Sequence, residues 1–279
     1  ALDPGAGGAR ARVLEVARPR SAHRRAGRTR SHRRADRAPS HAGTRVDVAA
    51  AAVGAARTAH RPALRRAGHR VVLVDLRGHG QSRPTTIAVS PELLASDIER
   101  LIAHLDLGEV SLVGHSLGGN LAQELVRRAP QRYGRLAVLD ATWNAGPLTV
   151  GERAALRLAG PMLRLIPSAR LPKLMADASA TTASARGDLT RTFASMSKGE
   201  FIAVWRATTE FVRPDASYRT PVPTLLVRGE RDTTGNIARA MPAWAAADRL
   251  TEVVIPDAGH VVTMDAPEAT SEALLTFLA

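Results

Sequence analysis

The chain has 279 residues, a net charge of +13 and no cysteine. Its length fits one domain with an insertion, and the missing thiols exclude disulfides, thiolate metal sites and cysteine redox chemistry. No apolar run approaches the ~20 residues that cross a bilayer, and no apolar core of a secretory signal occurs, so we expect a cytoplasmic protein without a membrane partner. We expect no metal and no cofactor, because no histidine or carboxylate cluster has ligand spacing and no glycine-rich phosphate loop occurs.

The beginning of the chain differs in composition from the rest. The first 70 residues hold 17 arginines, no lysine, four acidic residues, and none of Phe, Tyr, Trp, Ile, Met, Asn or Gln. Their charge of +13 equals that of the whole chain, so residues 71–279 are neutral overall. Such a segment buries too little apolar surface to offset its conformational entropy. We therefore expect residues 1–60 to form an atypical, poorly ordered Arg/Ala-rich segment.

Three interpretations of this segment are open. A basic arm for nucleic acid would normally mix lysine with arginine and include aromatic residues for base stacking, so its composition argues against a nucleic-acid partner. An arginine-rich transit peptide fits poorly, because about 60 residues have a uniform character and position 1 is not Met. The third interpretation, which we favour, is GC-rich coding DNA translated out of frame, because ordinary globular sequence resumes abruptly near residue 61.

From residue 61 onward, apolar strand patterns alternate with amphipathic helix patterns. Strands separated by helices imply an α/β fold, with a mostly parallel central sheet and helices on both faces. We predict strands near residues 70–75, 109–114, 135–140, 223–228 and 251–256, and helices near 91–105, 116–129, 236–247 and 266–278.

An insertion from about residue 144 to 219 interrupts this alternation within the predicted domain 61–279. It has a helical pattern that we expect Pro161, Pro167 and Pro172 to break. The insertion also holds three of the four phenylalanines of the chain. We interpret it as a helical cap whose apolar inner face shapes a pocket.

Residues 114–118 (GHSLG) form the most informative motif of the chain. A buried strand pattern precedes Ser116, and an amphipathic helix pattern follows it. A serine at a sharp turn between strand and helix projects from the backbone, and it needs small residues two positions to either side. Gly114 and Gly118 meet that need, and Gly119 lets the helix pack close to the sheet. We predict that Ser116 is a nucleophile; a hydroxyl that only caps the helix is the alternative.

A serine nucleophile needs a base to take its proton and a carboxylate to orient that base. In this architecture the expected chain order is serine, acid, histidine. Only His260 lies downstream of Ser116, in a loop after an apolar strand. Asp232, at the end of the preceding strand, is the predicted acid. Asp140 is a reserve candidate at the end of another strand, and Glu230 is a weaker one.

Four segments together resemble the small, cofactor-free enzymes of the α/β-hydrolase-fold family. The resemblance covers residues 62 to 279. The segments that carry it are residues 75–82 (DLRGHGQS), 114–119 (GHSLGG), 229–232 (GERD) and 259–260 (GH).

This resemblance implies a serine hydrolase that cleaves a carboxylic ester, a lactone or a related small acyl compound. Ser116 would attack the carbonyl, His260 would move the proton, and Asp232 would orient His260. The backbone N–H of Leu117 would supply one half of the oxyanion hole. Hydrolysis of C–C bonds and cofactor-free perhydrolysis use the same triad, whereas a serine at position 116 argues against epoxide hydrolase or dehalogenase chemistry.

The second oxyanion donor is where the sequence departs from the family. A His-Gly loop after a central strand normally supplies it, yet the matching position near residues 48–49 has no such pair. Only the weak strand pattern at residues 44–49 is available there. Loss of one donor typically slows such enzymes by about 100- to 1000-fold, so a catalytically impaired relative is the alternative function.

We expect an acyl pocket beside the serine. Its predicted lining consists of His115 in the motif, Trp143 just before the insertion, and Phe201 and Trp205 within the insertion.

Overall fold

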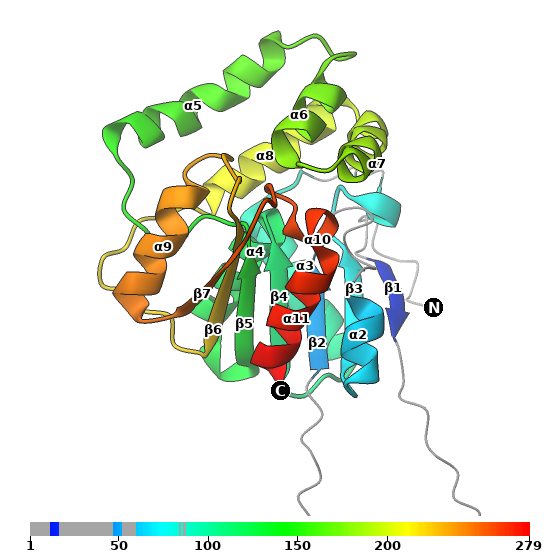
Figure 1. The fold of residues 1–279 in the computed structure, drawn as a ribbon, viewed down its shortest axis with the longest axis vertical. Helices are drawn as coiled ribbons and strands as arrows, with labels where there is room; N and C mark the ends of the chain where they lie inside the picture. Colours follow the sequence, from blue (N-terminus) through cyan, green and yellow to red (C-terminus); the bar gives the residue numbers. More distant parts are fainter. Residues whose placement is uncertain (1–11, 17–46, 52–59, 84, 86–87) are drawn as a thin grey trace, which may run out of the picture.

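In the computed structural model, residues 12–16, 47–51, 60–83, 85 and 88–279 are described, with side chains from residue 60 onward (Figure 1). They form a seven-stranded sheet in the order β1-β3-β2-β4-β5-β6-β7, in which only β1 runs antiparallel to its neighbour. The prediction of an α/β fold with a mostly parallel sheet is confirmed. The strands are β1 (Arg12–Val16), β2 (Asp47–Ala51), β3 (Arg70–Asp75), β4 (Val110–His115), β5 (Tyr133–Leu139), β6 (Thr224–Gly229) and β7 (Thr251–Ile255).

The four main-domain helices predicted from the sequence begin and end within one residue of their predicted ranges, while α2 and α10 were not predicted. In α3 the Ser90 side chain accepts a hydrogen bond from the N–H of Leu93, and Pro91 occupies the first turn, as is usual at a helix start. The helices of the main domain are α2 (Arg61–Arg66), α3 (Pro91–His104), α4 (Leu117–Arg128), α9 (Ile237–Asp248), α10 (Val262–Asp265) and α11 (Pro267–Leu278).

The helices cover the two faces of the sheet in separate groups. Successive residues of a strand point to opposite faces, so β3 places Val72 and Val74 on one face and Val71 and Leu73 on the other. The first face packs against α3, α4 and α9, and the second packs against α2 and α11. Buried apolar side chains cover both faces of the sheet, which explains why the central strands are continuous apolar runs.

Two strands come from the part of the chain before residue 61. β2 lies between β3 and β4 and is parallel to both, with Ala51 opposite Gly114. It overlaps the weak strand pattern at residues 44–49, so this pattern does form a central strand of the sheet. Residues 1–11, 17–46 and 52–59 lie outside the described residues, and so does the expectation that they are poorly ordered.

The insertion forms four helices that lie above one end of the sheet, and we call them the cap (Figure 1). Thr149 and Ser197 start two of these helices with reciprocal capping boxes. The prediction that Pro161 breaks the helical pattern is wrong, because it lies inside the first of them. Pro167 does lie between two helices, while Pro172 is in the first turn of the next. The cap helices are α5 (Val150–Leu165), α6 (Leu171–Ser179), α7 (Ala183–Ala194) and α8 (Lys198–Glu210).

A buried histidine makes the stability of the fold dependent on pH. His60, just before α2, contacts Ser271 of α11 at 2.8 Å, and burial lowers its pKa from 6.5 to about 4. Between these values the unfolded chain binds a proton that the folded chain does not, so folding weakens as the pH falls. We expect this group to cost up to about 3 kcal/mol between pH 6.5 and 4.

The variant His60→Gln isolates this contribution. Its free energy of unfolding, measured in urea at each pH, is compared with that of the unchanged protein. The difference between the two proteins should change by about 3 kcal/mol across that window, because all other titrating groups cancel. A difference that stays constant from pH 6.5 to 4 would show that His60 is not buried in this way.

Candidate active site

Ser116 lies on a sharp turn between β4 and α4. Its backbone has φ 51° and ψ −118°, a conformation that residues other than glycine rarely adopt. Its N–H donates to the carbonyl of Leu139 at 2.9 Å. A Cβ atom on Gly114 would lie 2.2 Å from the carbonyl oxygen of Gly118, and one on Gly119 would lie 2.6 Å from the Cβ of Ala141. The turn therefore requires the glycines that the sequence motif supplies.

The variant Gly114→Ala should destabilise the protein by about 3 kcal/mol or more, because its new methyl group meets backbone that cannot move aside. The control is Gly187→Ala in α7, where the nearest atom is the flexible Arg191 side chain at 3.7 Å. That change should stabilise the helix by up to ~1 kcal/mol. Thermal unfolding measures both. Equal melting temperatures for the two variants would contradict the tight turn.

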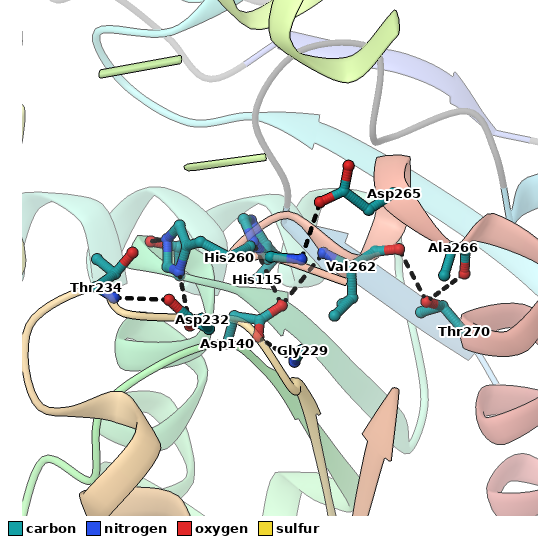
Figure 2. A network of polar contacts seen from close by, with 12 residues as sticks. His115, Asp140, Gly229, Asp232, Thr234, His260, Val262, Asp265, Ala266 and Thr270 are labelled. Carbon is teal, nitrogen blue, oxygen red and sulfur yellow. Dashed lines mark hydrogen bonds and ion pairs between the residues drawn. The ribbon is translucent and has the colours of Figure 1, made fainter. Parts of the chain in front are cut away.

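Three side chains from separate strand ends form one chain of hydrogen bonds. Figure 2 shows the part of it that joins Asp232 to His260. The Nε2 atom of His260 lies 2.9 Å from the Oγ of Ser116, and its Nδ1 lies 3.1 Å from the Oδ2 of Asp232. The structure thus brings together the three residues that the sequence places in the order serine, acid, histidine. With Nδ1 donating to the carboxylate, Nε2 is free to accept the serine proton.

Asp232 is buried, with 2 % of its surface exposed, yet it is held in the ionised form. Burial alone raises its pKa, but the hydrogen bond and charge of His260 and the N–H of Thr234, at 2.8 Å, outweigh burial. The pKa of this carboxyl therefore lies below its ordinary value. An ionised Asp232 can stabilise a positive charge on His260.

The reserve candidate Asp140 lies beside the pair but contacts different groups. Its two oxygens accept hydrogen bonds from the backbone N–H groups of Gly229 at 2.8 Å and Val262 at 3.3 Å. It is fully buried, and both burial and the nearby charge of Asp232 raise its pKa well above the usual range. Asp140 thus links the two loops that carry Asp232 and His260 rather than contacting the histidine ring (Figure 2).

The weaker candidate Glu230 is exposed and accepts a hydrogen bond from the N–H of Asp257 at 3.1 Å. It therefore joins the loop after β6 to the loop after β7 and does not contact His260.

The loop that carries His260 is fixed from several sides. The Nε2–H of His115 donates to the carbonyl oxygen of His260 at 2.7 Å, and burial lowers the pKa of His115 to about 4, which keeps it neutral. Asp265 accepts from the N–H of Gly259 at 2.9 Å, and the N–H of Val261 donates to the carbonyl of Ser179 at the end of α6. The cap thus helps to hold the histidine loop in place.

The predicted oxyanion donor Leu117 is the first residue of α4. N–H groups in the first turn of a helix have no acceptor within the helix, and the helix dipole favours negative charge there. The loop that would hold a second donor follows β2. Residues 52–59 of that loop lie outside the described residues.

A cavity of about 420 Å³ lies between the cap and the strand ends and reaches both Ser116 and His260. Phe193 and Phe201 meet there edge to face, with ring centres 5.6 Å apart. Its surface is mainly apolar, and most of its apolar lining residues belong to the cap. The cap residues that line it include Leu156, Ala159, Met175, Leu189, Phe193, Met196, Phe201, Val204 and Trp205.

Three of the four predicted pocket residues line this cavity, namely His115, Phe201 and Trp205. The prediction for Trp143 is wrong. The residue is 7 % exposed, and its ring stacks on Trp244 of α9, with ring centres 6.1 Å apart, in the core on one face of the sheet.

The cavity lining also includes polar residues that the sequence analysis did not assign to it. His79, within the segment 75–82 that carries the family resemblance, is buried and lines the cavity. Asn120 in the first turns of α4 also lines it. Its position four residues after Ser116 was a usable signal, since residues four apart share one face of a helix.

A model of the alpha/beta hydrolase family matches residues 54–273. The chain belongs to this family. Among curated relatives, the dihydrolipoyllysine-residue acetyltransferase component of the acetoin cleaving system from Pseudomonas putida is 28% identical over 216 residues, which is 76% of this chain and 57% of that protein. The sn-1-specific diacylglycerol lipase ABHD11 of Mus musculus is 40% identical over 77 residues, 28% of this chain and 25% of the lipase. The chain thus spans little more than half of the first relative.

Solved structures agree with the family assignment. A thermophilic esterase from Thermogutta terrifontis superposes with a TM-score of 0.69 at 26% identity, covering 85% of this chain and 90% of the esterase. The enol-lactonase from Burkholderia xenovorans LB400 has a TM-score of 0.71 at 20% identity, covering 85% and 92%, and at that identity it supports the fold alone. Family membership and the esterase and lipase relatives support hydrolase activity.

Within the described part of the chain, no group of three or more His, Asp or Glu side chains is arranged to hold a metal ion. In the same residues, no helix combines the length and apolar character that a bilayer crossing requires.

Proposed function

We propose that this hydrolase cleaves a carboxylic ester or a lactone of a small, neutral acyl compound through an acyl-enzyme on Ser116. The observation that carries the proposal is the unbroken hydrogen-bonded chain from Ser116 through His260 to Asp232. This chain joins a nucleophile, a base and an orienting carboxylate at the floor of an apolar cavity.

In the first half of the reaction, the Ser116 oxygen attacks the carbonyl carbon while its proton passes to Nε2 of His260. Asp232 stabilises the resulting imidazolium, and the N–H of Leu117 stabilises the negative oxygen of the tetrahedral intermediate. The intermediate collapses to the acyl-enzyme as the C–O bond to the alcohol breaks. The departing alkoxide takes the proton from His260; in a lactone, this alcohol stays attached to the acyl chain.

In the second half, water replaces the alcohol. His260 removes a proton from the water, whose oxygen attacks the acyl carbon. The second tetrahedral intermediate releases the carboxylic acid, and the proton on His260 returns to the oxygen of Ser116. The net change is the addition of one water molecule across the C–O bond.

The charges around the cavity favour a neutral substrate. Among the described residues that line it, none is a lysine or an arginine. Of the two carboxylates, Asp140 is buried against backbone N–H groups, and Glu152 forms an ion pair with Arg239 at 2.6 Å. An anionic acyl chain would therefore meet no cation, and desolvating its charge would cost binding energy.

The size of the cavity should set the preferred acyl length. Replacing Trp205 with Ala removes a large side chain from the cavity wall. We expect kcat/KM of Trp205→Ala to rise for esters with longer or branched acyl chains and to fall for short ones. The ratio of kcat/KM for long esters to that for short esters should increase about tenfold or more. The matched control is Trp143→Phe, which lies outside the cavity lining. In this control, the ratio of kcat/KM for long and short esters should stay unchanged. A change as large as that in Trp205→Ala would contradict the assignment of Trp205 to the cavity wall.

The proposal is tested by hydrolysis of p-nitrophenyl esters of increasing acyl length, together with one ester whose acyl chain ends in a carboxylate. We expect turnover of the neutral esters and much lower kcat/KM for the anionic one. A folded protein that hydrolyses none of these esters and no simple lactone above the background rate would favour the catalytically impaired alternative.

A further inference from the structure

Helix α5 of the cap exposes large apolar side chains to solvent. Val150, Leu158, Met162 and Leu165 have 82%, 60%, 60% and 78% of their surfaces exposed. They supply four of the six large, exposed apolar side chains of the described residues. Large exposed apolar side chains gathered on one helix usually mark a place of contact with another surface.

The sequence of α5 divides its surface into three lengthwise stripes. Glu152, Leu156 and Ala159, spaced four and three apart, face inward and line the cavity. The exposed stripe includes Leu158, Met162 and Leu165, again four and three apart, on a different side of the helix. One helix therefore has an inner stripe that faces the cavity and an apolar outer stripe that faces solvent.

Basic side chains form the third stripe. Arg153, Arg157 and Arg164, spaced four and seven apart, are exposed and lie between the outer and inner stripes. None of the three has a carboxylate partner among the described residues, and Arg170, just before α6, is also exposed without one. The acidic residue of α5, Glu152, is neutralised by Arg239.

We propose that the outer face of α5 lies on an anionic lipid surface. The apolar stripe would enter the boundary between headgroups and acyl chains, and the three arginines would contact the phosphates. Such a helix needs no spanning segment, so the absence of a membrane-crossing run does not bear on it. Figure 1 shows α5 at the edge of the cap farthest from the sheet, where a flat surface can reach it.

Charge argues against a second copy of this chain as the occupant. A two-fold contact through this face would bring two unneutralised arginine stripes together, and like charges repel. An anionic lipid surface can bury the apolar outer stripe and neutralise the arginine stripe at the same time. Because the inner stripe lines the cavity, such binding would also place the cavity close to acyl chains in the lipid.

The absence of cysteine allows a site-specific probe in the full chain. Leu158→Cys is labelled with a dye whose emission depends on polarity, and the same label on Ala103→Cys is the control. Ala103 is exposed near the end of α3, which leads into the start of β4 at the opposite end of the sheet from the cap. Phosphatidylglycerol vesicles should shift the emission of the label at 158 to the blue and leave the label at 103 unchanged.

Variants then distinguish vesicle binding through α5 from vesicle binding through the arginine-rich beginning of the chain. Co-sedimentation with phosphatidylglycerol vesicles should weaken on the order of tenfold for each of Leu158→Gln, Met162→Gln and Leu165→Gln. It should weaken about fivefold for each arginine of the stripe changed to Gln. Phosphatidylcholine vesicles should bind the protein weakly. All these side chains are exposed and outside the cavity lining, and circular dichroism confirms that the variants fold.

Three results would overturn the proposal. One is an unchanged emission of the label at 158 when the protein co-sediments, which would assign binding to another part of the chain. Another is the absence of binding to phosphatidylglycerol vesicles. The third is a blue shift without vesicles that grows with protein concentration, which would show that a second copy covers α5.

Discussion

The variant Ser116→Ala should lower kcat/KM for ester hydrolysis by about a million-fold, to the level left by binding and the oxyanion donor alone. Ser116 is the only hydroxyl that the structure places within hydrogen-bond distance of Nε2 of His260 among the described residues. Without it no acyl-enzyme can form, and His260 has no proton to move. The loss should appear in kcat with little change in substrate affinity, because the cavity walls are untouched.

The control for this loss is Ser184→Ala, which changes an exposed serine in α7. It should keep full activity. The thermal stability of Ser116→Ala should stay close to that of the unchanged protein, because alanine keeps the same backbone turn at φ 51° and only the hydroxyl is removed. Activity of Ser116→Ala within tenfold of the unchanged protein would contradict the assigned nucleophile.

The variant Asp232→Asn should lower kcat by about 10⁴-fold. The amide keeps the size of the side chain but removes the charge, and its NH₂ group can donate to Nδ1 of His260. The imidazole would then carry its proton on Nε2, where it cannot accept the proton of Ser116. The pKa of Asp232 lies below its ordinary value, so the unchanged protein keeps this charge as the pH falls below neutrality.

Asp140→Asn is the matched control, because Asp140 is an equally buried carboxylate next to the same histidine loop. An amide can accept from only one of Gly229 and Val262 and places NH₂ against the other N–H. We expect a loss of about 1–3 kcal/mol in stability and a fall in kcat of less than 100-fold. Steady-state kinetics measure the fall in kcat of each variant, and thermal unfolding measures its loss of stability. A larger fall in kcat for Asp140→Asn than for Asp232→Asn would make Asp140 the acid.

The features that the sequence predicted well are local ones. The turn at Ser116 depends on glycines two positions away, and its context is a strand followed by a helix, so neighbouring residues determine it. Asp232 and His260 were located by their places at strand ends, because the carboxyl ends of parallel strands meet at one edge of a sheet. The sequence ranked Asp232 above Asp140, and the structure shows that Asp232 contacts the His260 ring whereas Asp140 accepts from the N–H of Gly229.

The errors concern residues whose surroundings come from distant parts of the chain. Trp143 follows β5, but its ring stacks within the core on that of Trp244, about 100 residues later. Pro161 would normally interrupt a helix by removing one hydrogen bond, yet packing of α5 on α8 maintains the helix around it. The weak pattern near residue 48 became a central strand because β3 and β4 offer it hydrogen bonds on both sides.

The most direct test of the account is covalent labelling of the purified protein with a fluorophosphonate, followed by intact mass and peptide mapping. We expect one label per chain, located on Ser116, absent in Ser116→Ala and strongly slowed in His260→Ala, because phosphonylation needs the same proton transfer as ester attack. A folded protein that stays unlabelled, or that is labelled equally fast without His260, would contradict the assignment of Ser116 as a nucleophile activated by His260.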